Sequence, residues 1–173
     1  VLGGIDWVIY NARYYNIRVM NLSLSADSTE SWQTDPLARA VRSAAAAGIV
    51  VVVAGGNYGR TSTGKVAFGT IGSPGHDPSV ITVGSSHMMA TTARGDDSVN
   101  FFSSRGPTRG ALQLANGSVV ADNLLKPDLV APGNKLVGAL ASDKAGGVLN
   151  YLSTSYPVLR QNSTSKSNVG KML

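Results

Sequence analysis

The sequence feature that most constrains the fold is the apolar run Ile49–Ala54, which ends in Gly55-Gly56-Asn57. Five consecutive branched apolar residues are typical of a strand buried on both faces, as in a parallel sheet. The run stops at two glycines and one carboxamide, at the edge where open α/β sheets bind their ligands. We therefore look for function around Asn57, although an asparagine there can also simply complete a turn.

The segments before the run complete a βαβ unit. Apolar residues at helical spacing predict a helix over residues 2–15, and a strand is expected over residues 18–24. Asp35 followed by Pro36 predicts the start of a second helix. Strand, helix and strand of these lengths predict parallel pairing. Further strands are expected at residues 79–84, 100–102 and 128–131.

The composition fits a compact α/β domain rich in loops. Charged residues make up 14% of the chain and glycine accounts for 20 of 173 residues. The formal net charge is +5, but the arginines are scattered, so we expect neither nucleic acid nor a membrane as a partner. The chain lacks cysteine, which excludes disulfides, thiol catalysis and thiolate zinc sites.

Five short motifs occur in order along the chain: Asn21–Ser25, Ala54–Asn57, Gly72–Gly75, Phe102–Pro107 and Lys126–Gly133. Together they resemble the subtilisin-like serine proteases (subtilases, peptidase family S8), over roughly residues 1–140. The resemblance implies an α/β fold with a parallel sheet in a three-layer, subtilisin-like arrangement, incomplete at both ends.

The resemblance also implies a role for individual residues. Asn57 matches the oxyanion-hole asparagine, which stabilises the charge that develops during acyl transfer. Pro74 matches a cis proline of the family. The remaining matches bind substrate: Ser23, Leu24 and Ser25 pair with its backbone, Ala54, Gly55 and Gly56 form one pocket wall, and Gly72 and Ser73 form the far side.

The chain departs from the family at the substrate strand and at the catalytic triad. Many relatives carry Gly-Gly where this chain has Ser25 and Ala26. The two histidines, His76 and His87, lie outside the family's histidine motif; we place His76 at the surface, in a turn, and His87 in a loop.

Two segments resemble the sequences around the catalytic aspartate and serine of the family, but their flanking residues differ. Asp6 falls on the polar face of the first predicted helix. Ser155 lacks the preceding Gly-Thr context and is followed by Tyr156-Pro157 instead of a long apolar helix. We therefore expect residues 1–173 to be part of a catalytic domain whose triad lies in flanking segments, with residues 143–173 a variable surface loop or disordered tail.

These observations predict a serine endopeptidase as the parent protein, secreted by family resemblance, with this segment inactive alone. Its partners would be a peptide or protein substrate and the flanking segments of its own domain. No cofactor and no metal are expected here, although Asp96-Asp97 forms an acidic pair and the complete enzyme could bind calcium. The alternatives are a non-catalytic, protease-derived peptide-binding module and a nucleotide-binding α/β domain, which the absence of G-x-G-x-x-G disfavours.

Overall fold

A computed structural model describes residues 1–89, 91–134, 136, 138–139, 155–156 and 171–172. The chain divides into two units, Val1–Pro132 and Gly133–Leu173. In the second unit, β8 (Gly138–Ala139) pairs with β9 (Lys171–Met172). Most of the expected tail at 143–173 lies outside the described residues, so that prediction stands untested.

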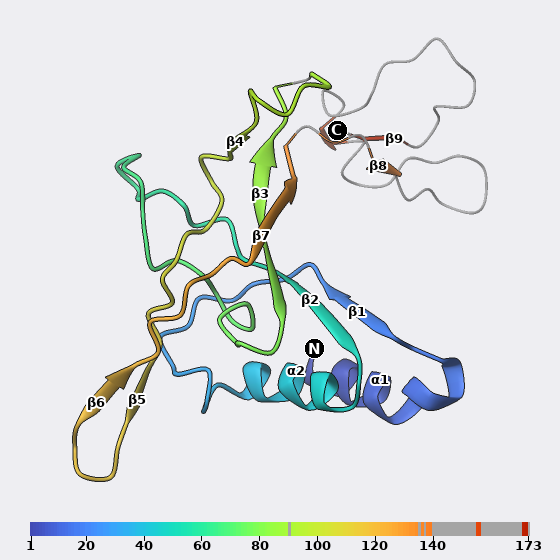
Figure 1. Ribbon diagram of the computed structural model, residues 1–173, viewed down its shortest axis with the longest axis vertical. Coiled ribbons are helices and arrows are strands. Elements are labelled where there is room, and N and C mark those ends of the chain that lie inside the picture. The colour runs from blue at the N-terminus through green and yellow to red at the C-terminus, as the bar shows by residue number, and fades with distance from the viewer. Residues whose placement is uncertain (90, 135, 137, 140–154, 157–170, 173) are drawn as a thin grey trace. The chain divides into compact units, whose positions relative to one another are not determined.

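The first unit is built on a mainly parallel sheet (Figure 1). Its parallel strands are β1 (Val19–Leu22), β2 (Val50–Ala54), β3 (Ile81–His87) and β7 (Leu129–Pro132), whereas β4 (Ser98–Val99) is antiparallel. β1 pairs with β2, β2 with the first half of β3, and β7 with its second half. The predicted parallel βαβ unit is confirmed.

Two helices lie beside one face of this sheet (Figure 1). α1 (Leu2–Tyr15) spans the predicted residues and ends at Asn16, whose left-handed φ of 53° asparagine tolerates. α2 (Pro36–Ala46) begins as predicted, because Asp35 accepts hydrogen bonds from the N–H groups of Leu37 and Ala38. None of the described helices is both long and apolar enough to span a bilayer.

The core lies between these helices and the facing side of the sheet. It joins buried side chains from both layers: Ile5 from α1, Val41 and Ala44 from α2, and Met20, Ile49, Val51, Val53 and Val80 from the strands and their ends. The three-layer expectation needs further helices on the opposite face, and the described residues supply two layers.

The prediction that the 49–53 run is buried on both faces is therefore only half right. Burial alternates along β2: Val51 and Val53 are buried, whereas Val50 is 47% exposed. Val50 and its neighbours in the sheet face the side that no described helix covers.

The remaining strands correct the sequence prediction in two places. The strand expected at 100–102 is a turn, and the nearby pairing is made by β4, two residues earlier. Asn100 is buried because its side-chain N–H donates to the Ser85 hydroxyl and the Ser86 carbonyl. The hairpin of β5 (Ala111–Gln113) and β6 (Val119–Ala121) was not expected at all.

Candidate functional site

Three chain segments meet at the carboxyl end of β2. The Gly72 N–H donates to the Gly55 carbonyl (N···O 3.2 Å), which ties the segment before β3 to the end of β2. Ala26 and Ser73 exchange two backbone hydrogen bonds of 2.9 and 2.8 Å, which ties the segment after β1 to the same place. These hydrogen bonds join the three segments that carry the residues predicted for the site, Ser23–Ser25, Ala54–Asn57 and Gly72-Ser73.

Asn57 lies on the surface directly beyond this junction. It is exposed, and its carboxamide has no hydrogen-bond partner among the residues that the structure describes. The turn it stands on is held by other groups: the Ser104 N–H donates to the Gly56 carbonyl, and the Tyr58 N–H donates to the Ser104 hydroxyl (3.1 Å). The carboxamide of Asn57 is therefore available to a ligand and is not used to complete its own turn.

Glycine is required at two positions around Asn57. Gly56 adopts φ 108°, a conformation that side chains strongly disfavour. A Cβ on Gly59 would lie 2.1 Å from the Ser103 carbonyl oxygen, because the 102–104 segment passes directly against it. The 102–107 motif therefore has a structural role that its sequence did not reveal: Ser104 fixes the turn that presents Asn57.

The segment Ser23–Ser25 follows β1 and has no regular secondary structure, since β1 ends at Leu22 instead of continuing to residue 24 as predicted. Ser23 is exposed and Leu24 half-buried. The hydroxyl oxygen of Ser25 is buried without a hydrogen-bond partner among the described residues. This oxygen lies between Gly56 and Gly72: a Cβ on Gly56 would lie 3.0 Å from it, and a Cβ on Gly72 would lie 2.2 Å from it.

Asp35 braces the Ser73 side of the junction. Its carboxylate accepts hydrogen bonds from the hydroxyls of Ser73 (2.8 Å) and Ser28 (3.0 Å), in addition to capping α2. Burial raises the pKa of Asp35, but the hydrogen bonds from the Ala38 N–H, Ser73 and Ser28, together with the charge of His76, outweigh it and leave the pKa below its ordinary value. The capping role was visible in the sequence, but the link to Ser73 depends on the tertiary fold.

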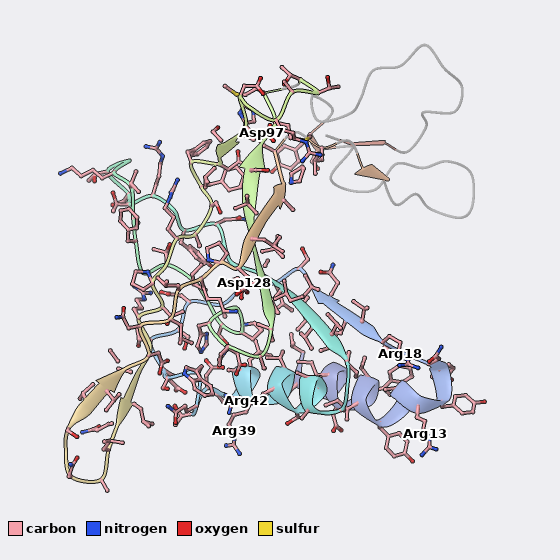
Figure 2. The ribbon with its side chains drawn as sticks, in the orientation of Figure 1. Arg13, Arg18, Arg39, Arg42, Asp97 and Asp128 are labelled. Carbon is pink, nitrogen blue, oxygen red and sulfur yellow. The ribbon has the colours of Figure 1, made fainter. Side chains whose placement is uncertain are left out.

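A second carboxylate lies beside the start of β3. Asp128 accepts from the ammonium of Lys126 (2.7 Å) and from the Thr82 N–H (2.6 Å) (Figure 2). Burial raises the pKa of Asp128, but the hydrogen bonds from Lys126 and Thr82 lower it by more, so that the pKa lies below its ordinary value. Lys126 is itself buried and donates to the Val80 carbonyl, so the pair anchors β7 to β3.

Both histidines differ from their predicted positions. His76 is 3% exposed instead of lying at the surface, because the whole turn after Pro74 is buried and is tied to β3 by the hydrogen bond from the Thr82 hydroxyl to the Gly75 carbonyl. Its Nε2 has no partner among the described residues. His87 is the last residue of β3 and does not lie in a loop. The cis peptide bond expected at Pro74 is present.

The two residues that imitate triad members are exposed. Asp6 lies on the outer side of α1, as predicted, and Ser155 belongs to the second unit. Within the described ranges, no group of three or more His, Asp or Glu residues is placed to hold a metal ion, and this includes Asp96-Asp97. The labelled arginines are scattered: Arg13 on α1 and Arg18 just before β1 lie near one end of the helices, and Arg39 and Arg42 lie on α2 (Figure 2).

Comparison with known proteins identifies the family. The model of the subtilase family (Peptidase S8) matches residues 1–168. Serine protease AprX of Bacillus subtilis is 39% identical over 142 residues, which cover 79% of this chain and 28% of AprX. A subtilisin-like protease of Coccidioides posadasii is 28% identical over 157 residues, 89% of this chain and 34% of that protein.

A solved structure supports the fold independently. Sphericase superposes with a TM-score of 0.55 at 23% identity, over 79% of this chain and 39% of its own. The chain thus spans about a third of the curated relatives it matches. The family model, the curated relatives and the parallel sheet agree, and the chain belongs to the subtilase family.

Proposed function

We propose that the protein carrying this chain is a serine endopeptidase, and that the present segment supplies the oxyanion donor and the substrate-binding edge. The observation that supports it most is Asn57: an exposed carboxamide without a partner among the described residues, on a turn fixed by Ser104 and directly beyond the junction of three segments. Such a preorganised N–H donor stabilises the oxyanion that forms when a peptide carbonyl is attacked.

The substrate backbone would lie along Ser23–Ser25, at the open edge beyond β1, where an extended peptide can form main-chain hydrogen bonds. The side chain before the scissile bond would enter between the segments of Ala54–Gly56 and Gly72-Ser73. In the complete enzyme, a histidine would activate a serine nucleophile, and both residues would lie in segments outside residues 1–173. Secretion of the parent protein is part of the same proposal and is suggested only by the family.

The test is substitution of Asn57 in the complete gene product. Asn57→Leu keeps approximate size but removes the N–H donor, so we expect kcat to fall with little change in KM, because the donor acts on the transition state. In subtilisin, a member of the same family, removal of one such donor costs about 10²–10³ in kcat, and we expect a loss of the same order here. Tyr58→Phe, on the adjacent exposed residue, is the matched control and should leave both constants unchanged.

The isolated segment should carry no reactive nucleophile. A fluorophosphonate probe, which labels activated serines, is expected to leave purified residues 1–173 unlabelled and to label the complete protein. Stoichiometric labelling at Ser155 of the isolated segment would show that it holds its own nucleophile.

A non-catalytic peptide-binding module is the second candidate, because the proposed substrate-binding edge contains no residue matched to the triad. It predicts that the complete protein binds extended peptides but hydrolyses none, and that the fluorophosphonate probe labels neither form.

A further inference from the structure

The Ser25 side chain occupies the gap between two segments that the proposed function assigns to the substrate pocket. A Cβ on Gly72 would lie 2.2 Å from the Ser25 hydroxyl oxygen, and a Cβ on Gly56 would lie 3.0 Å from it. The hydroxyl oxygen thus touches the backbone of both walls, and it is fully buried.

Neither wall can move aside easily. The Gly56 carbonyl accepts a hydrogen bond from the Ser104 N–H, and the φ of Gly56 is 108°. The Gly72 N–H donates to the Gly55 carbonyl, and the next residue, Ser73, pairs with Ala26. The width of the gap is therefore fixed by main-chain hydrogen bonds, and its contents are decided by the side chain at position 25.

The Ser25 hydroxyl makes no hydrogen bond that would explain its burial. Among the described residues it is one of three buried side-chain polar atoms without a partner. Buried hydroxyls normally find one, so folding alone does not account for a serine here. In this position the side chain fills the space between Gly56 and Gly72.

We propose that Ser25 is a specificity-determining residue, which restricts the pocket for the side chain before the scissile bond to small residues such as alanine. This inference rests on the proposed function, because that function identifies the gap as the pocket. An aromatic side chain needs the space that Ser25 fills, whereas the methyl group of alanine ends short of it. Glycine at position 25 would reopen the gap.

The experiment compares the complete gene product with two variants, Ser25→Gly and Ser62→Gly. Ser62→Gly makes the same exchange in an exposed turn outside the site, and serves as the matched control. Substrates are tetrapeptide p-nitroanilides that differ only in the residue before the scissile bond, alanine or phenylalanine. The corresponding peptide acids are also titrated calorimetrically, since their binding requires no nucleophile.

We expect the wild-type protein to prefer alanine over phenylalanine by at least about tenfold in kcat/KM, a range that differences in pocket size ordinarily produce. Ser25→Gly should lower that ratio by at least about tenfold, and Ser62→Gly should leave it within about threefold. The ratio of the affinities for the alanine and phenylalanine peptide acids should fall in the Ser25→Gly variant, as the ratio of the kcat/KM values does.

The two proposals fail in different ways. If the complete protein hydrolyses nothing, the protease proposal fails, and the peptide acids still decide the role of Ser25. A wild-type protein that binds the phenylalanine peptide as well as the alanine peptide overturns the size limit. An unchanged preference in the Ser25→Gly variant also overturns it. The same holds if neither peptide acid binds to the wild type or to the variant.

Discussion

The two faces of the sheet carry similar residues in opposite environments. On the face toward α1 and α2, Val51 is 2% and Val53 is 1% exposed. On the other face, Val19 is 58%, Val50 47% and Ile81 38% exposed. The register places Val19 beside Val50 and Ile81 beside Val52, so the exposed residues are neighbours on one surface and not isolated cases.

The comparison shows that an apolar run specifies a strand but not what covers it. Continuous branched residues are typical of strands buried on both faces, and a contiguous apolar surface of this kind normally has a partner. The described residues cover one face, so in this segment the two faces should contribute very differently to stability.

The largest expected difference comes from placing a lysine on each face of β2 in the 173-residue chain. Val51→Lys puts an unpaired charge into the core and should reduce the free energy of unfolding by about 4 kcal/mol or more. Val50→Lys changes a half-exposed position and should cost less than about 1 kcal/mol. Urea unfolding of both variants measures the difference, and equal losses would show that both faces are covered in solution.

A buried ion pair should likewise contribute more to stability than an exposed one. The Arg42 guanidinium lies 2.8 Å from the Asp77 carboxylate, which is 0% exposed, whereas Arg109 and Asp27 pair at the surface. Arg42→Met leaves a buried carboxylate without its cation and should cost about 3 kcal/mol. Arg109→Met should cost about 1 kcal/mol or less. Comparable costs in urea unfolding would contradict the burial of the Asp77 carboxylate beside Arg42.

The pH dependence of stability tests how α2 is anchored to the covered face. The pKa of Asp35 is lowered in the folded state, so its contribution is present above the unfolded value of about 4 and is lost as the pH falls through the folded pKa. Asp35→Asn should remove this part of the acid sensitivity. Ser73→Ala, which removes one of the hydrogen bonds to Asp35, should give an intermediate result when the unfolding midpoint is followed from pH 6 to pH 2.

The smallest effect is expected at the site edge, where two serine hydroxyls differ in their partners. Ser25→Ala removes a buried hydroxyl without a hydrogen-bond partner among the described residues and should raise the unfolding free energy by about 0.5–1 kcal/mol. Ser104→Ala removes the acceptor of the Tyr58 N–H and should lower it by about 1 kcal/mol. A loss of stability in both variants would indicate that Ser25 has a hydrogen-bond partner in solution.

Local patterns in the sequence were sufficient for the elements whose residues interact mainly within the element. The helix over residues 2–15, the cap at Asp35 and the strand at β2 follow from helical spacing, a side chain that bonds the first N–H groups, and a branched apolar run. The predicted strand at 100–102 failed because Asn100 bonds distant groups on β3, which no local pattern can show.

The candidate site was only partly predictable for the same reason. Its residues could be named from short motifs, but the roles of Ser104, Asp35 and Ser25 depend on contacts between segments 30 to 50 residues apart. His76 was misplaced because a polar residue in a turn is ordinarily exposed, and here the turn itself is packed.

The sequence by itself determined the family, the parallel βαβ unit and the position of Asn57 after a strand, because these depend on residue order and periodicity. The tertiary structure decided which face of the sheet is covered, which carboxylates are braced, and that the Ser25 hydroxyl lies between Gly56 and Gly72. Those properties arise where distant segments meet, and hydrogen bonds between their main chains set the distances that no single segment encodes.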